Sequence, residues 1–160
     1  MNFSQCMGIN WNRRENIFVK ALRVLIVLLI SGMLFLAAIG KLLDNRHFAE
    51  VLAQWQLFPS WSLLSLGVLA SLSELILAIW LLSGWRLAPA ALMAVAFHLA
   101  YSAATLVTVL RGIRLPDCGC FGIFFSHPLD WTMVAEDSIL AGICFVLYLA
   151  APRNKPENKI

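Results

Sequence analysis

The chain has 160 residues, of which 61 % are hydrophobic and 13 % are charged, and its mean hydropathy is +0.80. A soluble domain of this length cannot bury so large an apolar fraction, so the composition excludes a soluble globular protein and predicts an integral protein of the lipid bilayer. The formal net charge of +3 reflects lysines and arginines beside the apolar segments, and we find no patch typical of nucleic-acid binding.

Four apolar segments are each long enough to cross the hydrocarbon core as a helix, which takes about 20 residues. They predict an all-α integral membrane protein, a four-transmembrane-helix bundle without a separate soluble domain. The membrane domain covers residues 21–152, between a basic N-terminal arm (1–20) and a short polar tail (153–160). The expected spans are approximately residues 22–41, 61–83, 87–110 and 130–151.

The connection between the first two spans has a helical pattern of its own. Phe48, Val51, Leu52 and Trp55 recur at three- and four-residue spacing, and Pro59 ends the segment. This pattern predicts a short outer interfacial helix on the membrane surface. Such a helix is either a simple connector or a lid over the loop between the third and fourth spans, which we call the CGC loop.

Lysines and arginines are unevenly distributed between the two ends of the predicted bundle. An even number of spans places both termini on one side, together with the turn between the second and third spans. That side holds most of the basic residues, and the other side holds only Lys41, Arg46, Arg111 and Arg114. Because cytoplasmic flanks carry the excess of positive charge, we predict cytoplasmic termini and a CGC loop on the outer side.

The CGC loop contains two cysteines, Cys118 and Cys120, with only Gly119 between them. Pro116 and Gly122 favour tight turns around the pair. A disulfide here would close a very small, strained ring that is easily reduced, and it would remove little entropy from the unfolded chain. On the outer side thiols can be oxidised, so we interpret the pair as a redox centre.

Two other interpretations of these cysteines stay open. They are thiols without a redox role, or ligands of a metal together with Asp117, His47 and His127. Their spacing matches no regular zinc motif, so we expect no metal. Cys144 lies about 14 residues into the last span, which at 1.5 Å per residue is too deep to reach the loop.

Ionisable side chains within the spans are few, and their cost in hydrocarbon predicts that they face the bundle interior. Glu74 and His98 lie at comparable depth in the second and third spans, where they could pair. Glu136 and Asp137 lie about one turn below the outer boundary, beneath the CGC loop. These groups either hold the helices together or move protons during thiol chemistry.

Three charged residues close to the cysteines complete the predicted set of supporting groups. Arg111 and Arg114 could pair with the acidic residues of the fourth span, and Asp117 directly precedes Cys118. A cation near Cys118 or Cys120 would also lower the pKa of the thiol.

Six short blocks of the sequence are shared with a known family of membrane proteins. They are Gly40-Lys41-Leu42-x-Asp44, Leu57-Phe58-Pro59, Ser73-Glu74-Leu75, Arg111-Gly112, Asp117-Cys118-Gly119-Cys120-Phe121-Gly122 and Glu136-Asp137. Through these blocks the chain resembles the methylamine utilisation protein MauE family from about residue 24 to 151. The resemblance implies a DoxX-like bundle in the bacterial inner (cytoplasmic) membrane. It also implies a role in maturing a disulfide-rich methylamine dehydrogenase subunit beside a thioredoxin-like periplasmic partner.

The architecture is also similar to quinone-linked thiol oxidoreductases of the vitamin K epoxide reductase and DsbB type, which use two cysteine pairs. One pair here makes an external CxxC partner the expectation and leaves a quinone as an open cofactor. Our principal prediction is an inner-membrane thiol–disulfide redox component, a candidate oxidoreductase that matures exported proteins with disulfides. The alternatives are a non-catalytic assembly subunit of a larger complex and transport through the bundle, which the lack of broken helices disfavours.

Overall fold

The computed structural model describes residues 11–151, with side chains from residue 17 onward. This part of the chain contains no strand, only an isolated antiparallel bridge between Leu115 and Leu129. The elements are α1 (Trp11–Leu43), α2 (Asn45–Gln54), the 3-10 helix η2 (Ser60–Ser62), α3 (Leu63–Ser83), α4 (Leu87–Leu110) and α5 (Trp131–Ala150).

The predicted all-α bundle with four membrane-spanning helices is confirmed. Four segments are long and apolar enough to cross a bilayer: Ile17–Leu43, Ser60–Ser83, Leu87–Leu110 and Trp131–Ala150. At most 33 % of the most apolar window of any span is buried inside the bundle, so most of its apolar surface faces outward, as expected for contact with lipid.

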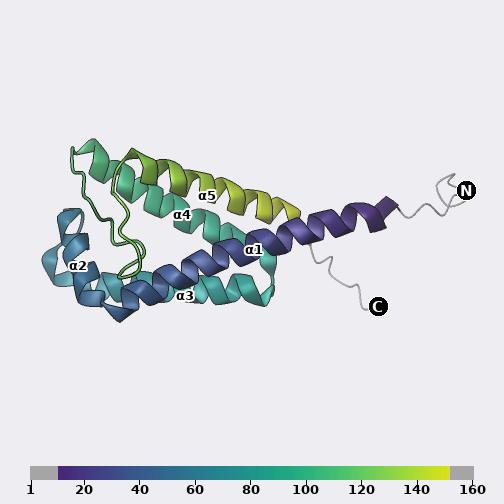
Figure 1. The fold of residues 1–160 in the computed structure, drawn as a ribbon, viewed down its shortest axis with the longest axis horizontal. Helices are drawn as coiled ribbons and strands as arrows, with labels where there is room; N and C mark the ends of the chain where they lie inside the picture. Colours follow the sequence, from purple (N-terminus) through teal and green to yellow (C-terminus); the bar gives the residue numbers. More distant parts are fainter. Residues whose placement is uncertain (1–10, 152–160) are drawn as a thin grey trace, which may run out of the picture.

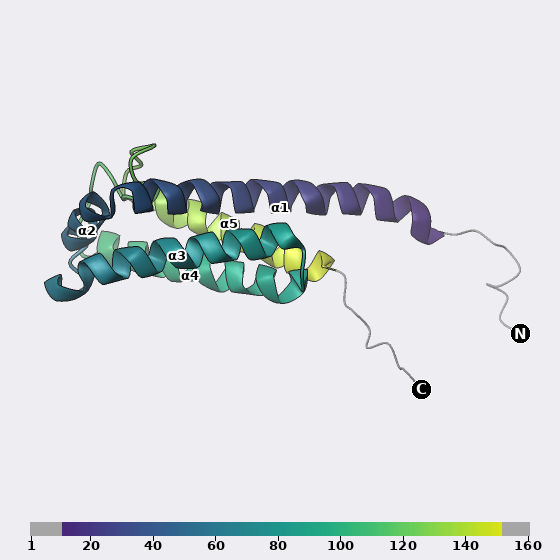
Figure 2. The same cartoon turned by 90° about the horizontal axis from the view of Figure 1, so that it is seen from below.

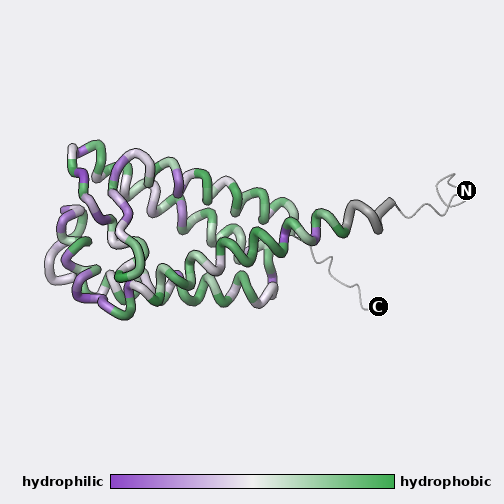
Figure 3. Tube along the Cα trace, in the orientation of Figure 1, coloured by the Kyte–Doolittle hydropathy of each residue, from purple (hydrophilic) through white to green (hydrophobic). Residues whose placement is uncertain are grey.

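The four long helices form two closely packed pairs. α1 packs along α3, and α4 packs along α5 (Figure 1). The turn between α3 and α4 lies at the same end as the C-terminal end of α5, and α1 extends beyond the bundle at that end (Figure 2). α2 and the CGC loop lie at the opposite end, where hydrophilic segments gather (Figure 3).

α1 begins earlier than the predicted first span. The helix is continuous from Trp11, so the second half of the N-terminal arm is helical. Residues 1–10 and 152–160, including Cys6 and most of the polar tail, lie outside the described residues.

Local sequence explains where two of the long helices end and begin. Gly84 adopts a left-handed conformation (φ +65°) that terminates α3, a role for which glycine is favoured. Asp130 caps α5 by accepting a hydrogen bond from the backbone N–H of Thr132 at 2.8 Å. Hydrogen bonds from the Thr132 hydroxyl and backbone hold the pKa of Asp130 below its ordinary value.

α2 buries the predicted apolar face. Phe48, Val51 and Leu52 point into the protein, and Asp44 caps the helix by accepting the backbone N–H of His47 at 3.0 Å. The buried face packs on α3 and on the CGC loop: a Cβ added at Gly119 would lie 2.9 Å from the Phe48 ring. α2 therefore covers one side of the cysteine pair.

Candidate redox site around Cys118 and Cys120

The two cysteines of the CGC loop are joined by a disulfide, with their Cα atoms 5.4 Å apart. The loop, from Arg111 to Asp130, reaches from the α4–α5 pair across to the side of α1 and α3 (Figure 1). The backbone N–H of Leu129 donates to the Leu115 carbonyl at 2.9 Å, and that of Cys118 donates to the His127 carbonyl at 2.7 Å. These bonds pair the outgoing and returning halves of the loop and fix the position of the disulfide.

Two glycines allow the CGC loop to dock directly on α1. A Cβ at Gly122 would lie 2.1 Å from the carbonyl carbon of Gly40, and a Cβ at Gly40 would lie 2.2 Å from the Phe121 carbonyl oxygen. Gly122 also has φ +54°, which disfavours any side chain. The last turn of α1 and the CGC loop, which are far apart in the sequence, therefore meet backbone to backbone.

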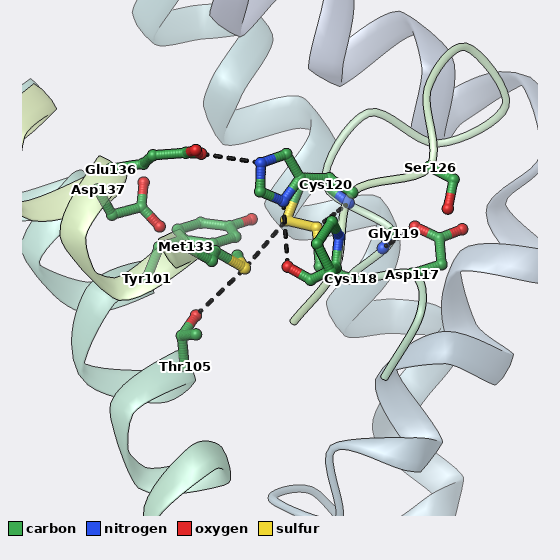
Figure 4. Close-up of a disulfide and its surroundings, with 12 residues drawn as sticks. Tyr101, Thr105, Asp117, Cys118, Gly119, Cys120, Ser126, Met133, Glu136 and Asp137 are labelled. Atoms are coloured by element: carbon green, nitrogen blue, oxygen red, sulfur yellow. Dashed lines mark hydrogen bonds and ion pairs between the residues drawn. A yellow bond between two sulfur atoms is a disulfide. The ribbon is translucent and has the colours of Figure 1, made fainter. Parts of the chain in front are cut away.

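The two sulfurs have different surroundings. Cys118 is fully buried, whereas Cys120 is partly exposed. Cys118 Sγ accepts the backbone N–H of Cys120 at 3.1 Å, and Cys120 Sγ lies 3.9 Å from Met133 Sδ (Figure 4). Asp117 does not face a thiol: its carboxylate accepts the backbone N–H of Gly119 at 2.9 Å and so shapes the turn.

Two cavities flank the disulfide, and both cysteines line each of them. The polar cavity, of about 90 Å³, lies on the side of α5 and includes most of the ionisable groups near the pair. The apolar cavity, of about 200 Å³, lies between α2, α3 and α4. The polar cavity is lined by His98, Tyr101, His127, Glu136 and Asp137, among others, and the apolar cavity by Phe48, Leu52, Trp55, Phe58 and Tyr101.

The pairing of the predicted acid–base groups differs from our expectation. His98 does not pair with Glu74; its Nδ1 lies 3.1 Å from Oδ1 of Asp137. Glu136 pairs with His127, whose Nε2 lies 2.9 Å from Oε2 of the carboxylate. The expectation was wrong because the position of a residue along a helix gives its depth in the membrane but not the direction in which its side chain points. α4 directs His98 towards α5, against which it packs most extensively.

Glu74 instead forms a buried ion pair with Lys41 of α1. Tyr101 donates its hydroxyl to Glu74 Oε1 at 3.0 Å, and the Lys41 ammonium lies 5.2 Å from the centre of the Phe48 ring. Sequence reasoning missed Lys41 because it was counted as a flanking cation. The signal was available: a lysine at the end of an apolar span and a lone carboxylate within the next one predict a charge pair.

The predicted ion pairs of Arg111 and Arg114 with the acidic residues are also wrong. Both arginines are exposed, and the Arg111 guanidinium donates to the backbone carbonyl of Gln56 at 2.8 Å. Arg111 follows the last residue of α4, and its side chain extends across the surface to Gln56, just beyond α2. It thus connects the end of α2 with the start of the CGC loop.

The remaining candidate residues are a further cysteine and the possible metal ligands. Cys144 is a free, buried thiol within α5, away from the CGC loop as expected. Within residues 11–151 no three His, Cys, Asp or Glu side chains are grouped as metal ligands. His47 Nε2 and Asp117 Oδ2 lie 4.0 Å apart at the edge of the loop.

Comparison with known families identifies the chain's relatives. The family model described as "Methylamine utilisation protein MauE" matches residues 18–150. The chain belongs to the MauE family. The predicted resemblance is therefore confirmed over nearly all of the membrane part. No solved structure matches the chain.

Three curated members of the MauE family are similar to it, each named "Methylamine utilization protein MauE". The protein of Paracoccus denitrificans is 28 % identical over 138 residues, which cover 86 % of this chain and 72 % of the relative. That of Paracoccus versutus is 29 % identical over 79 % of this chain and 68 % of the relative. That of Methylorubrum extorquens is 28 % identical, with coverages of 86 % and 72 %.

Proposed function

We propose that this MauE-family protein is a thiol–disulfide redox component of the bacterial inner membrane. Its Cys118–Cys120 pair exchanges with the thiols of a thioredoxin-like periplasmic protein. The observation that carries the proposal is a disulfide between near-neighbour cysteines that lines two cavities, one of them rich in ionisable side chains. A disulfide within one short loop joins no separate elements and adds little stability, so a structural role explains it poorly.

The unequal burial of the two sulfurs assigns them different roles in this exchange. A thiolate of the partner attacks the accessible Cys120 Sγ, forming a mixed disulfide. The bond between the two cysteines breaks, and its electron pair stays on Cys118 Sγ as a thiolate. The N–H of Cys120, 3.1 Å from that sulfur, is placed to stabilise the negative charge. The partner's second thiolate then resolves the mixed disulfide, so the partner leaves oxidised and Cys118 and Cys120 leave reduced.

Re-oxidation of the pair needs an electron acceptor, and the apolar cavity has the properties of a quinone site. A cavity of about 150 Å³ accepts a benzene ring, and this one, of about 200 Å³, has room for a substituted ring. The Trp55 indole nitrogen is buried and has no hydrogen-bond partner within residues 17–151. It is therefore free to donate to a ring carbonyl. A bound quinone would accept two electrons and two protons from the dithiol.

The process that we propose for this chain is methylamine utilisation, after the names of its three relatives. Within that process the protein would help to mature a disulfide-containing subunit of methylamine dehydrogenase. We further propose that both termini are cytoplasmic and that the CGC loop is periplasmic. The charge bias of the flanks supports this orientation, as does the position of the loop at the end opposite the α3–α4 turn.

The test is a comparison of single-cysteine variants of the full-length membrane protein in cells. Cys118→Ser leaves Cys120 as a single thiol, which can attack the disulfide of the oxidised partner but has no neighbouring thiol with which to complete the exchange. We therefore expect a mixed disulfide that survives non-reducing electrophoresis and is identified by mass spectrometry. Cys120→Ser should trap at least tenfold less, and Cys144→Ser should behave as wild type. Equal trapping by both loop variants would overturn the assignment of roles.

Two further measurements separate the redox proposal from an assembly role. A pair that stays fully bonded during methylamine-dependent growth, in a protein that co-purifies at fixed stoichiometry with a membrane complex, would identify an assembly subunit. Unimpaired growth and subunit maturation in a Cys118→Ser/Cys120→Ser variant would reject the redox role.

A further inference from the structure

The polar cavity beside the disulfide is lined by a buried histidine that has one nitrogen without a hydrogen-bond partner. His98 is 3 % exposed, and its Nδ1 is engaged by Asp137 at 3.1 Å. Its Nε2 has no hydrogen-bond partner within the described side chains, although the atom is buried. An unsatisfied buried polar atom is costly, so it indicates a ligand or water in the space that it faces.

The cavity that His98 lines is small and is shared with the two sulfurs. Its volume of about 90 Å³ exceeds the 10–15 Å³ that a single water needs, so it can hold several water molecules. At its outer edge lie His127 and Glu136, which are 25 % and 55 % exposed. The cavity therefore joins a buried histidine, the disulfide and a solvent-accessible acid–base pair.

We propose that His98, positioned by Asp137, is the internal proton donor for opening of the disulfide. This inference rests on the proposed redox function. When the partner attacks Cys120, the leaving Cys118 thiolate is fully buried, and one neutral N–H donor compensates only part of the cost of burying a charge. Protonated His98 transfers its Nε2 proton to Cys118 Sγ, directly or through one water, which yields a neutral thiol and a neutral imidazole. The histidine regains a proton from solvent through His127 and Glu136.

Asp137 positions the imidazole ring of His98. A carboxylate on Nδ1 fixes the orientation of the ring and leaves Nε2 as the nitrogen that can pass on a proton. Other ionisable groups near His98 are Glu74 of α3 and, lining the same cavity, Tyr101 of α4, Glu136 of α5 and His127 of the CGC loop; Lys41 of α1 is paired with Glu74.

The test measures how fast dithiothreitol opens the Cys118–Cys120 disulfide in the purified full-length protein, between pH 5 and 9. Rates are divided by the concentration of the dithiothreitol thiolate, so that only the protein's own titration remains. We expect the corrected wild-type rate to fall as His98 loses its proton. His98→Asn keeps a donor towards Asp137 but cannot supply a proton. The corrected rate should therefore become independent of pH. At pH 6 it should fall about tenfold to a hundredfold, which is a modest share of the acceleration typical of general acids.

Two further variants separate proton transfer from packing. Ser102→Ala removes hydrogen bonds between α4 and α5, to Val134 O at 3.3 Å and Ser138 Oγ at 3.0 Å, yet Ser102 does not line the cavity. It should keep the wild-type pH profile. Asp137→Asn removes the carboxylate that holds the ring in position, so the corrected rate at pH 6 should fall about tenfold.

The outcomes of the two proposals can be told apart. A wild-type pH profile in His98→Asn, with exchange still occurring, overturns the role of His98 and leaves the redox function standing. If neither the wild-type protein nor any variant exchanges its disulfide with added thiols, the redox function itself is overturned. Should His98→Asn fail to fold, a wild-type rate at pH 6 in Asp137→Asn overturns the inference.

Discussion

Neutralising one member of the Lys41–Glu74 ion pair tests whether it carries the stability of the bundle. The side chains are only 1 % and 3 % exposed, so neither charge can be solvated when its partner is lost. Removing one partner of a buried pair typically costs 3–5 kcal/mol. We therefore expect Glu74→Gln and Lys41→Met each to lower the free energy of unfolding by about 3–5 kcal/mol.

The double variant separates the cost of an orphaned charge from the loss of attraction. Lys41→Met/Glu74→Gln leaves no charge at the site of this pair, and the glutamine oxygen can still accept the Tyr101 hydroxyl, now 3.0 Å from Glu74 Oε1. We expect it to be within about 2 kcal/mol of the wild type, because replacing a buried ion pair by neutral groups is often close to neutral.

The assay is reversible unfolding by denaturing detergent in mixed micelles, followed by the fluorescence of the 6 tryptophans. Ser73→Ala is the control, since this exposed serine lies in α3 beside Glu74 and bonds only to the Ala70 carbonyl. Single variants that lose less than about 1 kcal/mol, or a double variant as unstable as the sum of the two, would refute the reasoning.

Three further predictions concern the CGC loop. Gly122→Ala should undock the loop from α1, because its Cβ would lie 2.1 Å from the Gly40 backbone; the melting temperature should fall by several degrees, whereas Gly142→Ala, which meets nothing within 4 Å, should not lower it. Phe48→Ala should uncover the cysteine pair, and reduced Cys118 should then be alkylated at least tenfold faster; the exposed Phe125→Ala is the control. Impermeant maleimide added to intact cells after mild reduction should label Cys120, and labelling only after lysis would place the loop in the cytoplasm.

The sequence could reveal the helices and the cysteine pair because both depend on local properties. Apolar segments of about 20 residues have few alternatives to a spanning helix. The three- and four-residue spacing of Phe48, Val51 and Leu52 likewise identified the buried face of α2 before its neighbours were known. Cys118 and Cys120 are close in any conformation of the loop.

The partners of the ionisable groups could not be predicted in the same way. Glu74 and His98 lie at similar depth, but depth along a helix leaves its rotation about the axis undefined, and that rotation depends on which helices pack together. Because α1 packs on α3 and α4 on α5, Glu74 meets Lys41 and His98 meets Asp137.

The sequence by itself determined that this protein is a bundle of four apolar helices with one adjacent pair of cysteines in a connecting loop, since hydropathy and chain proximity are local properties. Only the tertiary structure decided that Cys118 is buried while Cys120 is accessible, and that His98 shares a cavity with both. Those features arise where the CGC loop docks on Gly40 of α1 and beneath α2, and they depend on contacts between residues far apart in the chain.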